Sequence, residues 1–132
     1  MRYIFSMIVL STFLFSQPEI VWSQIFDNND SDFGKSVQLT LDGGYIMVGH
    51  TGNIDSDILL IKTDSEGNEE WTSIYNNDVY DFGEHVISTA DGGYIISGYS
   101  GENQNSGSIY IIKTDSYGNQ EWNQLYSVNG NN

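Results

Sequence analysis

Cysteine is absent from the 132-residue sequence, proline occurs once, and lysine and arginine together number only four. Without cysteine the chain can form no disulfide and carry no lipid-modified cysteine. Packing and hydrogen bonds alone must therefore hold the folded domain together. The 18 acidic residues give a formal net charge of −14. Because nucleic acids and anionic membranes would repel this charge, we expect neither as a partner.

The longest apolar stretch lies at the start of the chain. Arg2 precedes Tyr3–Phe15, a stretch that only two serines and a threonine interrupt. A short basic start followed by such a stretch is typical of a secretory signal peptide and is short for a membrane span. We predict a signal peptide over residues 1–16, a mature chain from Gln17, and a secreted or cell-surface location without membrane insertion. An uncleaved membrane anchor is the alternative.

The rest of the chain, residues 17–132, is dominated by two copies of one repeat. The first copy reads WSQIFDNNDSDFGKSVQLTLDGGYIMVGHTGN from Trp22, followed by IDSDILLIKTDSEGNEE. The second reads WTSIYNNDVYDFGEHVISTADGGYIISGYSGE from Trp71, followed by NQNSGSIYIIKTDSYGNQE. The second copy carries a short insertion after its second strand, and Trp122 opens what would be a third copy.

Each copy predicts four short strands joined by tight turns. An Asp-Gly pair follows the first strand of both copies, and such pairs favour hairpins because glycine accepts a positive φ. The predicted strands are Ser36–Leu41, Tyr45–His50, Ile58–Thr63 and Glu70–Tyr75, then Glu84–Thr89, Tyr94–Ser100, Ile109–Thr114 and Glu121–Ser127.

The second and third strands of each copy are continuous apolar runs, as in Ile58–Ile61 and Ile109–Ile112. Because successive side chains of a strand point to opposite faces, these strands need cover on both sides. Four-stranded sheets that stack at a period of ~40–50 residues are the blades of a β-propeller. We therefore predict an all-β, β-propeller-type fold, with a flat two-sheet sandwich as the alternative.

The predicted partial propeller has blade one at about 33–76 and blade two at about 82–127. A lone outer strand at about 20–26 precedes them, and such a strand is one way in which a propeller closes its last blade. Two blades cannot close a ring, so the expected partners are further blades of the same protein or further copies of the chain.

The motifs W-x-x-x-[FY], D-F-G, T-x-D-G-G-Y-I and I-K-T-D-S-x-G-N-x-E-W follow one another in both copies, over nearly all of Trp22 to Tyr126. In these motifs the chain resembles a repeat of secreted bacterial β-propeller proteins that are frequent in Bacteroidota. The resemblance implies a propeller fold and a secreted or surface location, and it implies no particular ligand.

The candidate metal ligands are scattered. His50 aligns with Tyr99 and His85 with Ser36, so the two histidines occupy different repeat positions and predict no shared transition-metal site. Seven loop aspartates could offer oxygen ligands to Ca²⁺, but they lack the Gly and Glu of an EF-hand loop, and solvated turn acids are the simpler interpretation. These are Asp27, Asp30, Asp32, Asp55, Asp57, Asp78 and Asp81. We predict no metal, no cofactor and no catalytic residue.

Several motifs that resemble catalytic ones have structural explanations. The run from Gly98 to Gly101 lacks the spacing and the following helix of a nucleophile elbow. Four aspartates lie beside turn glycines, where bonding to the backbone explains them, and we assign none as a glycosidase carboxylate. They are Asp42, Asp64, Asp91 and Asp115.

Lys62 and Lys113 occupy the same repeat position, directly after the apolar third strand. We predict that each forms a structural ion pair with a repeated aspartate. The pairs considered are Asp32/Asp81 and Asp64/Asp115.

These features favour a non-catalytic, exported β-propeller module that binds or scaffolds a protein or a glycan. A first alternative is a lectin formed when two-blade chains self-assemble, with Tyr99, Tyr110, Asn103 and Asn105 as candidate sugar contacts. A second alternative is a fragment of a propeller-containing secreted hydrolase, whose catalytic site would lie on other blades.

Overall fold

The computed structural model describes residues 22–27, 30–53, 55–103 and 106–127, and all regular structure in these ranges is β-strand. The expected signal peptide, residues 1–16, lies outside them. The predicted all-β fold with two four-stranded antiparallel sheets is confirmed. The strands are β1 (Asp32–Leu39), β2 (Tyr45–Thr51), β3 (Asp57–Thr63), β4 (Glu69–Tyr75), β5 (Tyr80–Ser88), β6 (Tyr94–Asn103), β7 (Ser106–Thr114) and β8 (Gln120–Tyr126).

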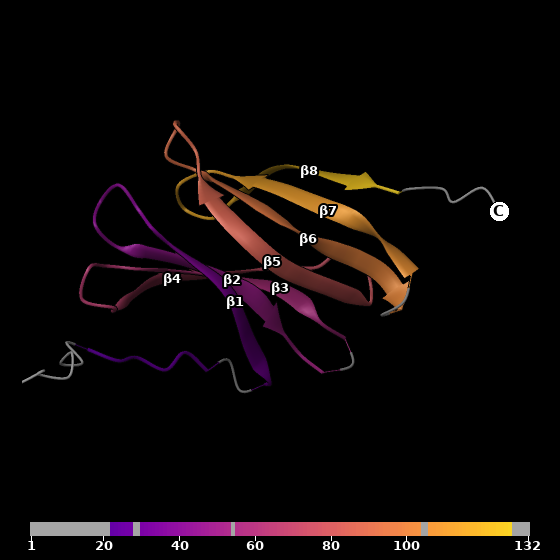
Figure 1. Ribbon diagram of the computed structural model, residues 1–132, viewed down its shortest axis with the longest axis horizontal. Helices are drawn as coiled ribbons and strands as arrows, with labels where there is room; N and C mark the ends of the chain where they lie inside the picture. The colour runs from indigo at the N-terminus through magenta and orange to yellow at the C-terminus, as the bar shows by residue number, and fades with distance from the viewer. Residues whose placement is uncertain (1–21, 28–29, 54, 104–105, 128–132) are drawn as a thin grey trace, which may run out of the picture.

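Each sheet is an antiparallel meander in which neighbours along the chain are also neighbours in space. The strand order is β1-β2-β3-β4 in the first sheet and β5-β6-β7-β8 in the second. Figure 1 shows the sheets as two stacked layers, with the segment Trp22–Asp27 along the outside of the first layer. Neither sheet closes on itself, and β5 packs against β1, β2 and β3 of the first sheet.

The first strand of each copy begins earlier than the sequence pattern predicts. In β1, Phe33 already pairs with His50, and in β5, Phe82 pairs with Tyr99. The register then shifts between Gly34 and Ser36, and at the same place in the second copy. Such a β-bulge interrupts the alternation of side chains, so the D-F-G motif resembles a turn in the sequence although it lies within a strand.

The two faces of each sheet pack differently. We call them the front face and the rear face and define each by residues of its two central strands. The front face of the first sheet carries Tyr45, Met47, Leu59 and Ile61, and the front face of the second carries Tyr94, Ile96, Tyr110 and Ile112. The rear face of the first sheet carries Ile46, Val48, Ile58 and Leu60, and the rear face of the second carries Ile95, Ser97, Ile109 and Ile111. The core forms where the rear face of the first sheet meets the front face of the second.

Gly83, the glycine of the second D-F-G, marks the closest approach of the sheets. A Cβ atom there would lie 2.6 Å from Cγ2 of Val48 and 2.7 Å from the carbonyl oxygen of Gly49. A Cβ atom on its counterpart Gly34 would meet no atom within 4 Å among the described residues. The difference arises because Gly83 faces the first sheet, whereas no sheet covers Gly34 in the described part of the chain.

The segment Trp22–Asp27 contains no strand, in contrast to the outer strand expected at about 20–26. An outer strand needs an inner neighbour for its backbone hydrogen bonds, and the described residues offer none at this place. The side chain of Trp22 nevertheless packs on the front face of the first sheet. Its ring centroid lies 5.5 Å from that of Tyr45, at an interplanar angle of 62°.

Candidate functional site

A groove of about 570 Å³ opens between the two sheets, at the end of the molecule that holds the β1–β2, β5–β6 and β7–β8 turns. Both sheets contribute to its walls. Trp71 comes from β4 of the first sheet, Tyr94 from β6 of the second, and Tyr117 from the β7–β8 turn. Trp71 and Tyr94 contact each other directly, with ring centroids 6.0 Å apart. The groove therefore exists only because the two repeats stack.

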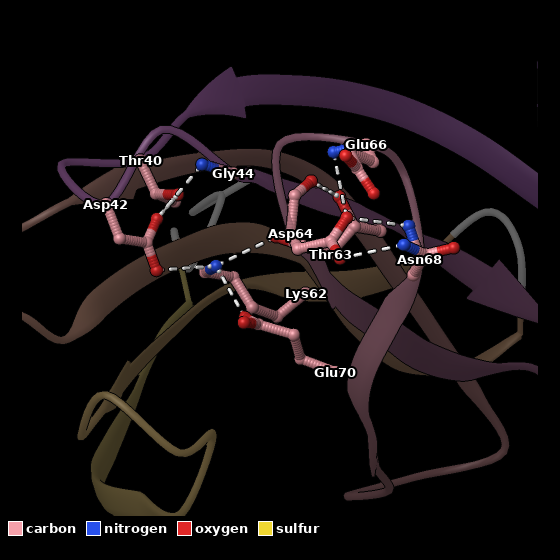
Figure 2. Close-up of polar contacts among 9 residues, drawn as sticks. All are labelled: Thr40, Asp42, Gly44, Lys62, Thr63, Asp64, Glu66, Asn68 and Glu70. Carbon is pink, nitrogen blue, oxygen red and sulfur yellow. Dashed lines mark hydrogen bonds and ion pairs between the residues drawn. The ribbon is translucent and has the colours of Figure 1, made fainter. Parts of the chain in front are cut away.

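Lys62 lies in the wall of this groove at the centre of a polar cluster. Its Nζ atom donates to Oδ2 of Asp42 at 2.8 Å, to Oε2 of Glu70 at 2.7 Å, and to the carbonyl oxygen of Thr63 at 2.9 Å. Figure 2 shows Lys62 between the two carboxylates, which come from the β1–β2 turn and from β4. The lysine side chain is 3% exposed, whereas the two carboxylates are about half exposed and face the solvent.

Lys113 repeats this arrangement in the second sheet. Its Nζ atom lies 3.0 Å from Asp91 and 3.0 Å from Glu121, and it donates to the carbonyl oxygen of Thr114 at 2.7 Å. Each lysine forms an ion pair with a repeated aspartate, as predicted, but both aspartate pairs considered for it were wrong. The aspartates that pair with the lysines are Asp42 and Asp91, not Asp32/Asp81 or Asp64/Asp115.

A β-bulge explains the partner that the sequence did not reveal. The register of β3 and β4 shifts between Lys62 and Thr63, which pair with Trp71 and Glu69. Glu70 is the extra residue of the bulge, so its side chain is turned toward Lys62. The same shift in the second sheet leaves Glu121 as the extra residue beside Lys113. The sequence signal is the Glu that precedes Trp in each copy.

The ion pairs keep the charges of this cluster in place. Burial alone would lower the pKa of Lys62, but its hydrogen bonds to Asp42 and Glu70 outweigh that effect and raise the pKa above its ordinary value. The hydrogen bonds from Lys62, Thr40 and the backbone of Gly44 hold the pKa of Asp42 well below its usual range. At neutral pH, Asp42 is therefore an anion paired with a cation.

Asp64 and Asp115 cap the turns after β3 and β7. Oδ1 of Asp64 accepts from the backbone N–H groups of Glu66 at 2.8 Å and Asn68 at 2.9 Å, as Figure 2 shows. Asp115 accepts the equivalent hydrogen bonds. The side-chain amides of Asn68 and Asn119 also donate to these carboxylates and are the largest cause that lowers the pKa of each, with the backbone N–H groups adding to it. The expected turn role of these two aspartates is confirmed.

His50 is buried between two aromatic rings. Its ring stacks on Phe33 with centroids 4.8 Å apart and meets Phe82 edge-on at 4.6 Å. Burial lowers the pKa of its imidazole. The other histidine, His85, contacts the hydroxyl of Ser36 at 3.1 Å through Nδ1.

Among the residues that the structure describes, no three His, Cys, Asp or Glu side chains gather as ligands for a metal ion. Asp81, one of the loop aspartates, is fully buried, and its Oδ2 accepts backbone N–H groups of Asn77 at 2.5 Å and Asp78 at 3.0 Å. Asp57 accepts from the side-chain amide of Asn76 at 2.6 Å. The interpretation of Asp81 as a solvated turn acid is wrong, because Asp81 lies within β5 and is buried. Its carboxylate instead accepts hydrogen bonds from the backbone that precedes β5.

Of the four candidate sugar contacts, the structure buries one, joins two by a hydrogen bond and does not describe the fourth. Tyr110 is 1% exposed in the core between the sheets and is not available to a ligand. The hydroxyl of Tyr99 donates to the carbonyl oxygen of Asn103, and Asn105 lies outside the described residues. The run Gly98–Gly101 lies inside β6 with Ser100 buried, so it forms no nucleophile elbow.

The aromatic residues that line the groove were not singled out in the sequence as ligand contacts. Trp71 and Tyr94 are repeated positions and look like core residues, whereas Tyr117 replaces Glu66 of the first copy. That substitution is the only sequence signal of an aromatic surface at this end.

No protein-family model and no curated protein matches this chain. Within the described ranges, no helix has the length and apolar character needed to cross a bilayer.

Proposed function

We propose that this chain is a non-catalytic, exported binding module, built on propeller-type stacking of its repeats, and that its ligand is a protein segment or a glycan held in the inter-sheet groove. The observation that supports this proposal most strongly is the composition of the groove. Its walls combine aromatic rings with fixed carboxylates at a junction between two repeats.

The aromatic part of the groove suits a planar or apolar ligand surface. Tyr117 is 73% exposed, so its ring is available for stacking, and Trp71 is half-buried beside it in the groove wall. Aromatic side chains supply a large contact area at a low cost in conformational entropy. Sugars and extended peptides both use such platforms.

The polar part of the groove favours binding over chemistry. Asp42 and Glu70 are each paired with Lys62, and the pKa of Asp42 is lowered. A general acid needs a carboxyl group that stays protonated near neutral pH, and that requires the opposite shift. The two carboxylates are instead suited to accept hydrogen bonds from hydroxyl or amide groups of a ligand.

Screening the purified chain on a glycan array and against a displayed random-peptide library tests the proposal. We expect binding in one of the two screens, followed by a dissociation constant from calorimetry. Tyr117→Ala should weaken this binding by about tenfold, because it removes an exposed aromatic contact without changing the core.

Tyr126→Ala is the matched control, because Tyr126 is also an exposed tyrosine but lies outside the groove. Its binding should equal that of the unchanged chain, measured at a chain concentration at which all samples are monomeric. Binding in neither screen, or equal losses in both variants, would overturn the groove as the binding site.

A further inference from the structure

The rear face of the second sheet repeats the surface that the first sheet buries. In the first sheet, Ile58 is 0% and Tyr75 7% exposed, because the second sheet covers them. Their repeat equivalents in the second sheet, Ile109 and Tyr126, are 55% and 56% exposed. Trp122, the equivalent of half-buried Trp71, is 48% exposed. Trp122 and Tyr126 lie on the same rear face as Ile95, Ile109 and Ile111. We call this whole surface the second-sheet rear face.

Trp71 and Tyr75 of the first sheet pack into a socket on the second sheet that Tyr94 and Gly118 form. The indole of Trp71 lies over Tyr94 and over Gly118, where a Cβ atom would come within 2.7 Å of Cζ3 of the indole. The hydroxyl of Tyr75 donates to the carbonyl oxygen of Gly118 at 2.7 Å. Gly118 has a φ of 78°, so both its backbone conformation and the lack of a side chain favour glycine.

The first sheet offers the same socket on its front face, and the chain fills it with its own Trp22. The Trp22 ring packs on Tyr45, and a Cβ atom on Gly67 would lie 2.7 Å from Cζ3 of Trp22. Gly67 has a φ of 85°. Trp22 therefore takes, on the first sheet, the place that Trp71 takes on the second.

On this front face Leu59 and Ile61 are buried, at 5% and 7% exposed, and the face is open along β1. Val37 is 62% exposed, whereas its equivalent Val86 is 1% exposed in the core. The space above Gly34, which is empty within 4 Å among the described residues, corresponds to the space above Gly83 that Val48 and Ile58 fill.

We propose that the second-sheet rear face docks on the front face of the first sheet of a second copy of this chain, with Trp122 replacing the second copy's Trp22 over Tyr45 and Gly67. The contact is head-to-tail and repeats the packing found inside each chain. Trp22 competes with Trp122 for one socket, so the N-terminal segment limits assembly.

Charge complementarity between β1 and β5 supports this register. Inside the chain, Nζ of Lys35 lies 3.7 Å from a carboxylate oxygen of Glu84, and Ser36 contacts His85. Because Glu84 and His85 occupy the same repeat positions as Lys35 and Ser36, the docked copies would place Glu84 of one against Lys35 of the other. The net charge of −14 opposes association, so salt should strengthen it.

Sedimentation velocity of four chains at low and at about 0.5 M NaCl tests the proposal. The chains are the unchanged one, Trp22→Ala, Trp122→Ala and the double variant, each checked for cooperative thermal unfolding. We expect Trp22→Ala to associate about tenfold more tightly than the unchanged chain. The Trp122→Ala and double variants should remain monomeric. A folded Trp22→Ala chain that stays monomeric at both salt concentrations, or a double variant that associates as strongly as Trp22→Ala, would overturn the proposal.

Cross-linking gives a readout that does not depend on removing a packed indole. The chain has no cysteine, so Ser36→Cys and His85→Cys can be introduced singly and the two chains mixed with a short bismaleimide. We expect the mixed pair to form a covalent dimer at least several-fold faster than either variant alone. Equal rates in the mixed and the unmixed samples would contradict the proposed register.

Discussion

Nζ of Lys62 lies 2.8 Å from Oδ2 of Asp42, and this pair joins the end of β3 to the turn between β1 and β2. The lysine is almost fully buried and the carboxylate is exposed, so the pair closes one wall of the groove while its anion faces outward. Lys113 and Asp91 form the same pair in the second sheet. Both copies of the repeat thus contain this pair. In the described part of the chain, a neighbouring sheet covers only the pair of Lys62 and Asp42.

Replacing Lys62 with methionine should destabilise the chain by about 1–2 kcal/mol, because two carboxylates lose their shared cation and a buried carbonyl loses a donor. Thermal and urea unfolding would measure the change. Lys35→Met is the control, since Lys35 is exposed and makes one long ion pair with Glu84. Unchanged stability in Lys62→Met would show that the cluster is not structural.

Lys113→Met should also lower the melting temperature, because Lys113 holds the same set of partners in the second sheet. We expect a smaller loss than for Lys62→Met, since no further sheet covers this cluster in the described part of the chain. A larger loss for Lys113→Met would contradict the role given to the inter-sheet cover.

The stability of the fold should decline as the pH falls through about 6.5, because His50 is buried. Folding lowers the pKa of His50 from its ordinary value of 6.5, so the unfolded chain takes up the proton first. The contribution is fully present above pH 6.5 and is lost as the pH falls from there toward the folded-state pKa. Melting temperatures between pH 8 and pH 5 would show the decline.

His50→Tyr is the matched variant for this pH dependence, because Tyr99 occupies the same repeat position in the second sheet and also lies near Phe82. The variant should fold and should lose the decline between pH 8 and pH 5. A decline of the same size in His50→Tyr would assign the titration to another group.

Gly83→Ala should destabilise the chain by about 1–3 kcal/mol, because the new methyl group would meet Val48 and the backbone of Gly49. Gly34→Ala is the matched control in the first copy, where no atom lies within 4 Å among the described residues. We expect its stability to stay within about 0.5 kcal/mol of the unchanged chain. Chemical denaturation of both variants makes the comparison, and equal losses would contradict the stacking of the sheets at Gly83.

Much of this fold could be predicted because the two copies share their turns and apolar runs. The second and third strands carry continuous apolar side chains, and the Asp-Gly turns fix the hairpins between the first two strands. The bulges could not be predicted, since they break the alternation on which strand prediction depends. The early start of β1 at Asp32 and the turn of Glu70 toward Lys62 both follow from bulges.

The groove could not be predicted because it belongs to neither repeat alone. Trp71 comes from the last strand of the first sheet and Tyr94 from the second strand of the second sheet, and only the offset between the sheets brings them together. The burial of Tyr110 has the same origin. The apolar run predicts cover on both faces of β7, but in the described part of the structure only the face that carries Tyr110 is covered, and Ile109 on the other face is 55% exposed. The sequence does not show which of the two faces meets the neighbouring sheet.

The central claim is that the two repeats stack and form the groove where Trp71 contacts Tyr94. A double-mutant cycle with Trp71→Leu and Tyr94→Leu, measured by chemical denaturation, tests it directly. The rings belong to different sheets, with centroids 6.0 Å apart, so we predict a coupling free energy of about 0.5–1.5 kcal/mol. Losses that add to within about 0.3 kcal/mol would show that the two sheets do not meet at these rings and would contradict the account.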